Sequence, residues 1–190
     1  HLNYLDLHHN SCYAPENITT VVIFALMIRL SQSNDIAAIL SIAEAIGFQP
    51  GELEVVHQLL TDYFTDGDGR DPLQNGNTRR FWLTYNQDNG EIIGVAYCEP
   101  ERMTDQTWNL QLIAVHPNHQ GQEHGGKLLC HVEEMLKAHG GRMLLVETLA
   151  SFDLAQAFYR KYGYEEEARI RDFYATGDDK VVFRKVLTAL

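Results

Sequence analysis

The chain has 190 residues, a length that fits one ordinary domain with a substantial hydrophobic core. Its 26 acidic residues outnumber its 15 basic residues and give a net charge of −11, which argues against a nucleic-acid partner and permits a cationic substrate. No stretch approaches the roughly 20 apolar residues of a membrane span, so we expect no membrane partner. Cys12, Cys98 and Cys130 are too few and too widely spaced for a disulfide framework or a zinc site, which favours the reducing cytoplasm.

The first half of the chain predicts a strand, two helices, a loop and a β-hairpin. Both helices carry an apolar stripe at three- and four-residue spacing; Asn34 or Asp35 caps the first, and Pro50 opens the second. The loop is rich in Gly, Asp and Asn, and the hairpin turns at an Asp-Asn-Gly sequence. The ranges are 25–30 for the strand, 36–46 and 50–64 for the helices, 65–78 for the loop, and 81–85 and 92–97 for the hairpin strands.

The middle of the chain predicts a buried strand, a glycine-rich turn and a helix. Residues 110–115 are apolar and end at a His-Pro pair, which indicates a buried strand. Residues 125–139 predict an amphipathic helix that ends at a Gly-Gly pair. The turn between them, residues 120–126, would present unpaired backbone N–H groups and the positive end of the helix dipole. It is therefore either a phosphate site or a tight turn without a ligand.

The C-terminal part predicts a further strand and helix followed by an antiparallel pair of strands. The strand covers residues 143–148, the helix runs from Asp153 to Tyr162, and the final pair covers residues 164–173 and 180–186. Strands dominate both ends of the chain and helices lie between them. We therefore predict an α+β fold with a mixed, mostly antiparallel central sheet flanked by helices.

Two motifs resemble the GNAT superfamily of N-acetyltransferases. Residues 115–129 resemble its acyl-CoA loop, Gln/Arg-x-x-Gly-x-Gly/Ala, with Gln120 and Gly125 at matching positions. Glu123 stands where the family has its first glycine. Residues 157–164, Ala-Phe-Tyr-Arg-Lys-Tyr-Gly-Tyr, resemble the family signature Phe-Tyr-x-x-x-Gly-Phe/Tyr. The resemblance extends over about residues 27–187, and two motifs in this order are more specific than either one alone.

The resemblance implies a GNAT-like fold and the transfer of an acetyl group from acetyl-CoA to a primary amine of a small molecule or a protein. The alternative is a degenerate GNAT domain that acts as an acyl-CoA sensor or interaction module without catalysis, a reading that Glu123 favours because its charge would repel a diphosphate. The resemblance also implies the residues that hold acetyl-CoA: Ile113, Ala114, Val115, Gln120, Gly121, Gln122, Glu123, His124, Gly125, Gly126, Lys127, Asp153 and Tyr159.

Acyl transfer needs a base for the amine, a donor that polarises the thioester carbonyl, and an acid for the departing thiolate. The resemblance assigns the acid to Tyr159, with a packing tyrosine as the alternative, and the carbonyl donor to a backbone N–H within residues 113–115. Glu99 and Glu147 are the candidate bases, beside Asp172 or a water chain. His116, His119 and His124 match no strong zinc pattern, so we expect no metal.

Residues 1–26 differ from the rest, because their composition is mixed and no clear period precedes the apolar run from residue 21. The run lacks the flanks of a signal peptide, and the family resemblance begins at Met27. We interpret residues 1–26 as an N-terminal extension, either vector-derived or read upstream of the true start, with a genuine extra strand as the alternative. Residues 27–190 are expected to form a single acetyltransferase domain, and homodimerisation stays open.

Overall fold

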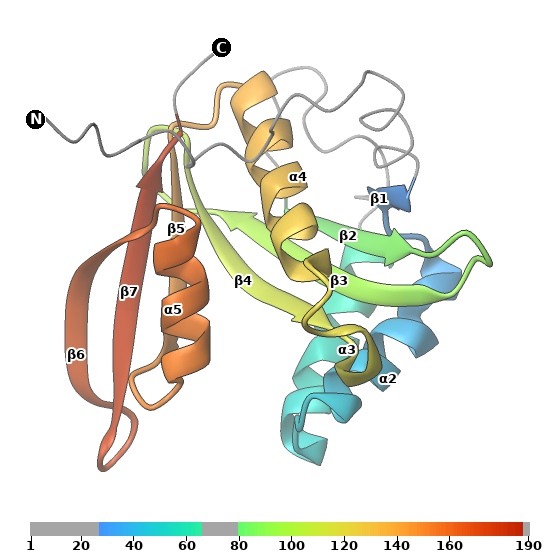
Figure 1. Ribbon diagram of the computed structural model, residues 1–190, viewed down its shortest axis with the longest axis horizontal. Helices are drawn as coiled ribbons and strands as arrows, with labels where there is room; N and C mark the ends of the chain where they lie inside the picture. Colours follow the sequence, from blue (N-terminus) through green and yellow to red (C-terminus); the bar gives the residue numbers. More distant parts are fainter. Residues whose placement is uncertain (1–26, 66–79, 188–190) are drawn as a thin grey trace, which may run out of the picture.

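The computed structural model describes residues 27–65 and 80–187 (Figure 1). The predicted extension over residues 1–26 and nearly all of the predicted loop over residues 65–78 lie outside the described residues. The strands are β1 (Ile28–Leu30), β2 (Phe81–Asn86), β3 (Ile92–Pro100), β4 (Thr107–Val115), β5 (Met143–Leu149), β6 (Glu165–Ala175) and β7 (Asp178–Val186). The helices are α2 (Ile36–Ala45), α3 (Pro50–Thr65), α4 (His124–Ala138) and α5 (Asp153–Lys161), with 3-10 turns at Ser33–Asp35 and Pro117–His119.

The described strands form one seven-stranded sheet in the order β1-β2-β3-β4-β5-β7-β6. Within it β4 and β5 are parallel, and the other neighbours are antiparallel. The connection between β4 and β5 contains α4, because parallel neighbours need a crossover. The predicted α+β class with a mixed, mostly antiparallel sheet is therefore confirmed.

The two faces of the sheet have separate cores. Alternate residues of β3 point to opposite faces, so Ala96 and Cys98 join one core while Val95 and Tyr97 join the other. The first core contains apolar side chains of α4 and α5, and the second contains those of α2 and α3. Figure 1 shows α4 and α5 over one face of the sheet, with α2 and α3 toward the other.

The structure corrects the predicted role of Asp35 and shows the state of two cysteines. Asp35 does precede α2, but its own side chain makes no cap to that helix; its carboxylate accepts from the Gln32 N–H at 2.7 Å and pairs with Arg29. Cys98 is a buried free thiol, whereas Cys130 is disulfide-bonded. A single disulfide-bonded cysteine is compatible with the prediction that the cysteines do not form a disulfide framework.

Candidate active site

An opening in the sheet lies between β4 and β5. The two strands pair over four residues each, Thr107–Leu110 with Met143–Val146. Beyond these residues β4 continues to Val115 and β5 to Leu149 without pairing to each other in the described ladder. A bulge starts the separation, because the register of β3 and β4 shifts between Tyr97 and Cys98 and leaves Gln111 unpaired.

The edge of β4 that faces the opening carries backbone groups of alternate residues. The N–H of His116 donates to the carbonyl of Ile93 at 2.8 Å, which fixes the phase of the antiparallel ladder. Because hydrogen-bonded pairs alternate along such a ladder, Ala114 directs its N–H and C=O to β3, and Ile113 and Val115 direct theirs toward the opening. Ile113, Ala114 and Val115 were all predicted to hold the cofactor, but the backbone groups of Ala114 are directed to β3 and not to the opening.

The turn that follows β4 presents a group of free N–H donors. Within the described chain, no backbone carbonyl accepts from the N–H groups of residues 121–126. The helix proper begins where the Lys127 N–H donates to the carbonyl of Glu123 at 3.0 Å. These donors converge at the positive end of α4, so the arrangement suits a bound anion such as a phosphate.

Glu123 has a backbone conformation that glycine adopts more easily. It is the N-cap of α4 with φ +65° and ψ 5°, in the left-handed region, and no cap hydrogen bond from its side chain is found in the described structure. A residue with a Cβ pays about 1 kcal/mol or more for this conformation. The position at which the family motif has its first glycine thus has a left-handed backbone in this chain, which glycine would adopt without strain.

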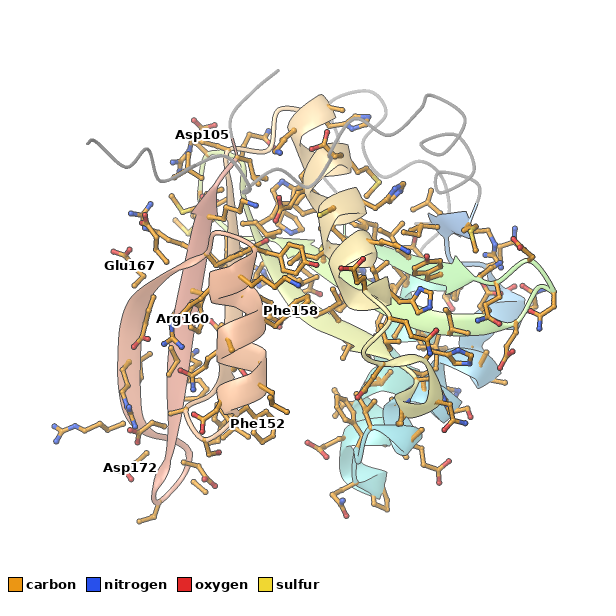
Figure 2. All side chains as sticks on the ribbon, viewed as in Figure 1. Asp105, Phe152, Phe158, Arg160, Glu167 and Asp172 are labelled. Carbon is orange, nitrogen blue, oxygen red and sulfur yellow. The ribbon has the colours of Figure 1, made fainter. Side chains whose placement is uncertain are left out.

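Helix α5 packs directly against this turn. A Cβ built at Gly125 would lie 3.7 Å from the Phe158 ring, an ordinary contact, and Figure 2 shows Phe158 between α5 and α4. A Cβ built at Gly126 would lie 1.7 Å from the Tyr162 hydroxyl, so no side chain fits there. Sequence reasoning missed Phe158 and Tyr162. The available signal was their position in the same helix as Tyr159: Phe158 comes one residue before it, and Tyr162 comes three residues after it.

Tyr159 lies in the core beneath the opening. It is 6% exposed, and its ring packs at 5.7 Å from Tyr164 and 5.9 Å from Phe183. Its hydroxyl makes no hydrogen bond that is found among the described residues. Burial, with a smaller effect of Cys98, raises the pKa of Tyr159. The phenol therefore keeps its proton at neutral pH and can donate it.

Glu147 lies on the other face of the sheet. Val146 pairs with β4 and points into the α4/α5 core, so Glu147, the next residue, points to the opposite face at the place where the opening begins. Its carboxylate pairs with the Lys180 Nζ at 2.9 Å. Tyr159 and Glu147 thus lie on opposite faces of the sheet.

Two further predicted carboxylates are engaged elsewhere. Glu99 accepts a hydrogen bond from the Tyr97 hydroxyl, and the Tyr97 ring stacks on Trp82 at 4.1 Å. Asp172 accepts from the Gly177 N–H at 2.7 Å and so holds the turn between β6 and β7. Asp153 is exposed in the first turn of α5. Glu99 therefore remains a possible base on the α2/α3 face, whereas Asp172 has a structural task.

The polar side chains of the turn mostly support its shape. Gln120 donates through Nε2 to the Val115 carbonyl at 2.9 Å, and Gln122 donates to the Asn118 carbonyl at 3.5 Å. The His124 ring packs edge-on against Tyr85, and burial followed by the charge of Lys127 lowers the pKa of His124. No group of three or more His, Cys, Asp and Glu side chains in the described residues is arranged to hold a metal ion.

These features fit the parts of an acyl-CoA. The free edge at Ile113 and Val115 can pair with the amides of an extended arm, and the N–H donors of the turn can bind a diphosphate. Tyr159 packs in the α4/α5 core on one face of the same sheet. In the described part of the chain no helix is long and apolar enough to cross a membrane.

Comparison with known proteins identifies the class. Residues 77–166 match the family model described as an acetyltransferase (GNAT) domain. The chain is 26% identical over 102 residues to N-alpha-acetyltransferase 30 of Schizosaccharomyces pombe, a match that covers 53% of this chain and 67% of that protein. Its fold superposes with TM-score 0.75 on a Desulfovibrio desulfuricans protein described as a GNAT-family acetyltransferase, at 26% identity over 85% of this chain and 98% of the other. The Escherichia coli ribosomal-protein-S18-alanine N-acetyltransferase matches with TM-score 0.66 and 23% identity, over 86% and 94% of the two chains.

The fold and the motifs thus define an acyltransferase of the GNAT type. Residues 77–166 carry a GNAT acetyltransferase domain, and the fold of the chain is similar to that of a GNAT-family acetyltransferase.

Proposed function

We propose that this chain transfers an acetyl group from acetyl-CoA to a primary amine, and that a protein N-terminus is the first acceptor to test. The opening between β4 and β5, placed directly before the N–H donors of the turn, is the observation that carries the proposal. The names of two similar proteins, an N-alpha-acetyltransferase and a ribosomal-protein-alanine acetyltransferase, support a protein N-terminus. The net charge of −11 favours an amine that arrives as a cation.

The chain's own residues divide the chemistry between the two faces of the sheet. Acetyl-CoA supplies the thioester whose acetyl group is transferred. The backbone edge at Ile113 and Val115 orients the arm and places an N–H where the carbonyl oxygen gains charge. Glu147 takes a proton from the incoming ammonium, directly or through water, and its pairing with Lys180 orients its carboxylate. Tyr159 gives its proton to the departing thiolate, and the second proton that the nitrogen loses on forming the amide returns to the phenolate through water.

Replacing Tyr159 with phenylalanine tests this assignment. The variant should fold like the parent, because the lost hydroxyl has no hydrogen-bond partner in the described structure. We expect turnover to fall by roughly 10²- to 10⁴-fold while CoA affinity stays nearly unchanged. Release of free thiol measures the first quantity, and calorimetry measures the second. Equal turnover in the two proteins would leave Tyr159 as a packing residue.

Comparing Glu147→Gln with Glu99→Gln identifies the base. Both substitutions preserve size and remove the charge, and they affect carboxylates near different parts of the sheet. If Glu147 is the base, only its variant should lose turnover at neutral pH and flatten the acidic limb of the pH profile. The opposite result would assign the base to Glu99, and normal profiles in both variants would favour a water chain.

The binding-module alternative is supported by Glu123, whose charge lies at the anion site. A protein that binds CoA but releases no thiol with any member of a panel of amines and N-terminal peptides would be such a module. Cytoplasmic location, homodimerisation and the division at residue 27 stay predictions.

A further inference from the structure

The Tyr162 hydroxyl occupies an unusual place beside the anion site. It lies where a Cβ at Gly126 would be, 1.7 Å from that ideal position, against the first turn of α4. The ring is fixed on its other side by Phe158, with the ring centroids 4.9 Å apart. The carbonyl of Tyr162 accepts from the Lys185 Nζ at 2.8 Å, which anchors the end of α5. The hydroxyl is therefore positioned by packing rather than by a hydrogen bond of its own.

This hydroxyl is available to a ligand. It forms no hydrogen bond with a described side chain or backbone group, and it is not fully buried. It stands beside Gly126, one of the residues whose N–H groups have no backbone acceptor in the described structure. The phenol therefore stands at the same end of α4 as the N–H groups that would hold an anion.

We propose that Tyr162 is a further residue of the cofactor site, whose hydroxyl donates a hydrogen bond to the diphosphate of the acyl-CoA. This inference rests on the proposed function. It accounts for glycine at position 126, because any larger residue would displace the hydroxyl. It also assigns a purpose to a tyrosine at the end of α5, where a purely apolar residue would pack against Phe158 equally well.

The charge of Glu123 makes a neutral donor useful at this place. Burial, followed by the Glu123 carboxylate, raises the pKa of Tyr162, so the phenol stays protonated and can donate. A hydrogen bond from a neutral donor to a charged oxygen is stronger than one between neutral groups. The Tyr162 hydroxyl thus offsets part of the repulsion that Glu123 exerts on a diphosphate.

The test measures binding of two ligands to the full chain and to Tyr162→Phe by calorimetry. CoA carries the diphosphate, and pantetheine lacks it. The substitution should weaken CoA about tenfold and leave pantetheine unchanged, because only the hydroxyl is lost. Tyr174→Phe, which removes a hydroxyl from an exposed tyrosine of β6, is the matched control and should leave CoA affinity as in the parent.

The outcomes distinguish a failure of the inference about Tyr162 from a failure of the proposed function. Unchanged CoA affinity in Tyr162→Phe would overturn the inference and leave the proposed function intact. Equal weakening of CoA and pantetheine would also overturn it, because a structural role would affect both ligands. A parent protein that binds neither ligand would refute the proposed function and this inference with it. Thermal unfolding of both variants shows that they fold.

Discussion

Replacing Glu123 with glycine separates the two costs that this residue brings to the anion site. The first cost is conformational: φ of +65° is strained for a residue with a Cβ by about 1 kcal/mol, and glycine releases it. Against this gain, glycine increases the freedom of the unfolded chain by about 0.4–1 kcal/mol, and it removes a carboxylate that favours the helix start by about 0.3–1 kcal/mol. We expect the free energy of unfolding to change by no more than about 1 kcal/mol.

The second cost is electrostatic and concerns the ligand. A carboxylate several ångströms from a diphosphate at a partly hydrated surface repels it by about 1 kcal/mol. Removing the charge should therefore tighten CoA about fivefold. Because salt screens exposed charges, the gain should shrink at high ionic strength.

Calorimetric titration with CoA at low and high salt measures this gain, and Glu123→Gln is the matched control. Glutamine removes the charge and keeps the side chain in the strained conformation, so it should show the salt-dependent part of the gain. Glycine should show that part plus a salt-independent part that comes from the backbone. If both variants bind CoA like the parent at both salt concentrations, the Glu123 side chain points to solvent and the reasoning is refuted.

Three further predictions concern stability. Gly125→Ala should be neutral or stabilise the fold by up to about 1 kcal/mol, whereas Gly126→Ala should destabilise it by about 1–3 kcal/mol because its Cβ meets the Tyr162 hydroxyl. Equal changes in the free energy of unfolding, measured with denaturant, would contradict this geometry. Glu133 is fully buried and pairs with the Lys185 Nζ at 2.7 Å, so Glu133→Ala should lower the free energy of unfolding by about 3 kcal/mol, and Glu133→Gln should lower it less. A decrease below about 1 kcal/mol in the Glu133→Ala variant would argue against a stabilising pair. Burial lowers the pKa of His131, so the unfolded chain takes up this proton before the folded chain does as the pH falls. Stability should therefore decrease below about pH 6.5, and it should decrease less in His131→Gln. If the variant and the parent show the same pH dependence of stability, His131 is not its source.

The elements of the fold were predictable because their signals are local. Apolar spacing and the stop at Gly140 gave α4 to within a residue or two, and the Asp-Asn-Gly sequence located the hairpin between β2 and β3. The first strand was predicted three residues too early, but two of those residues lie outside the described chain. The neighbours in the sheet are non-local, so the order of the strands could not be read from local spacing.

The candidate site was predictable in its motifs and not in its geometry. The sequence indicated a turn that binds an anion, but the unpaired half of β4 depends on a bulge opposite Cys98, and no local pattern shows a bulge. The direction of the Ala114 N–H and C=O depends on the phase of the hydrogen-bond ladder, so it could not be predicted from the sequence either. Tyr162 was missed because its importance comes from a contact with Gly126, far away in sequence.

The opening between β4 and β5 also divides the molecule mechanically. On one side of it lie β1 to β4, on the other lie β5, β7 and β6, and in the described sheet four residue pairs join the two halves. The joint between the two halves of the sheet is therefore short compared with the ladders of β2 with β3 and of β5 with β7. On the α4 side the buried pair of Glu133 and Lys185 ties α4 to β7, across the two halves. The opening therefore lies beside a short joint of the sheet, and an ion pair outside the site connects elements on either side of it.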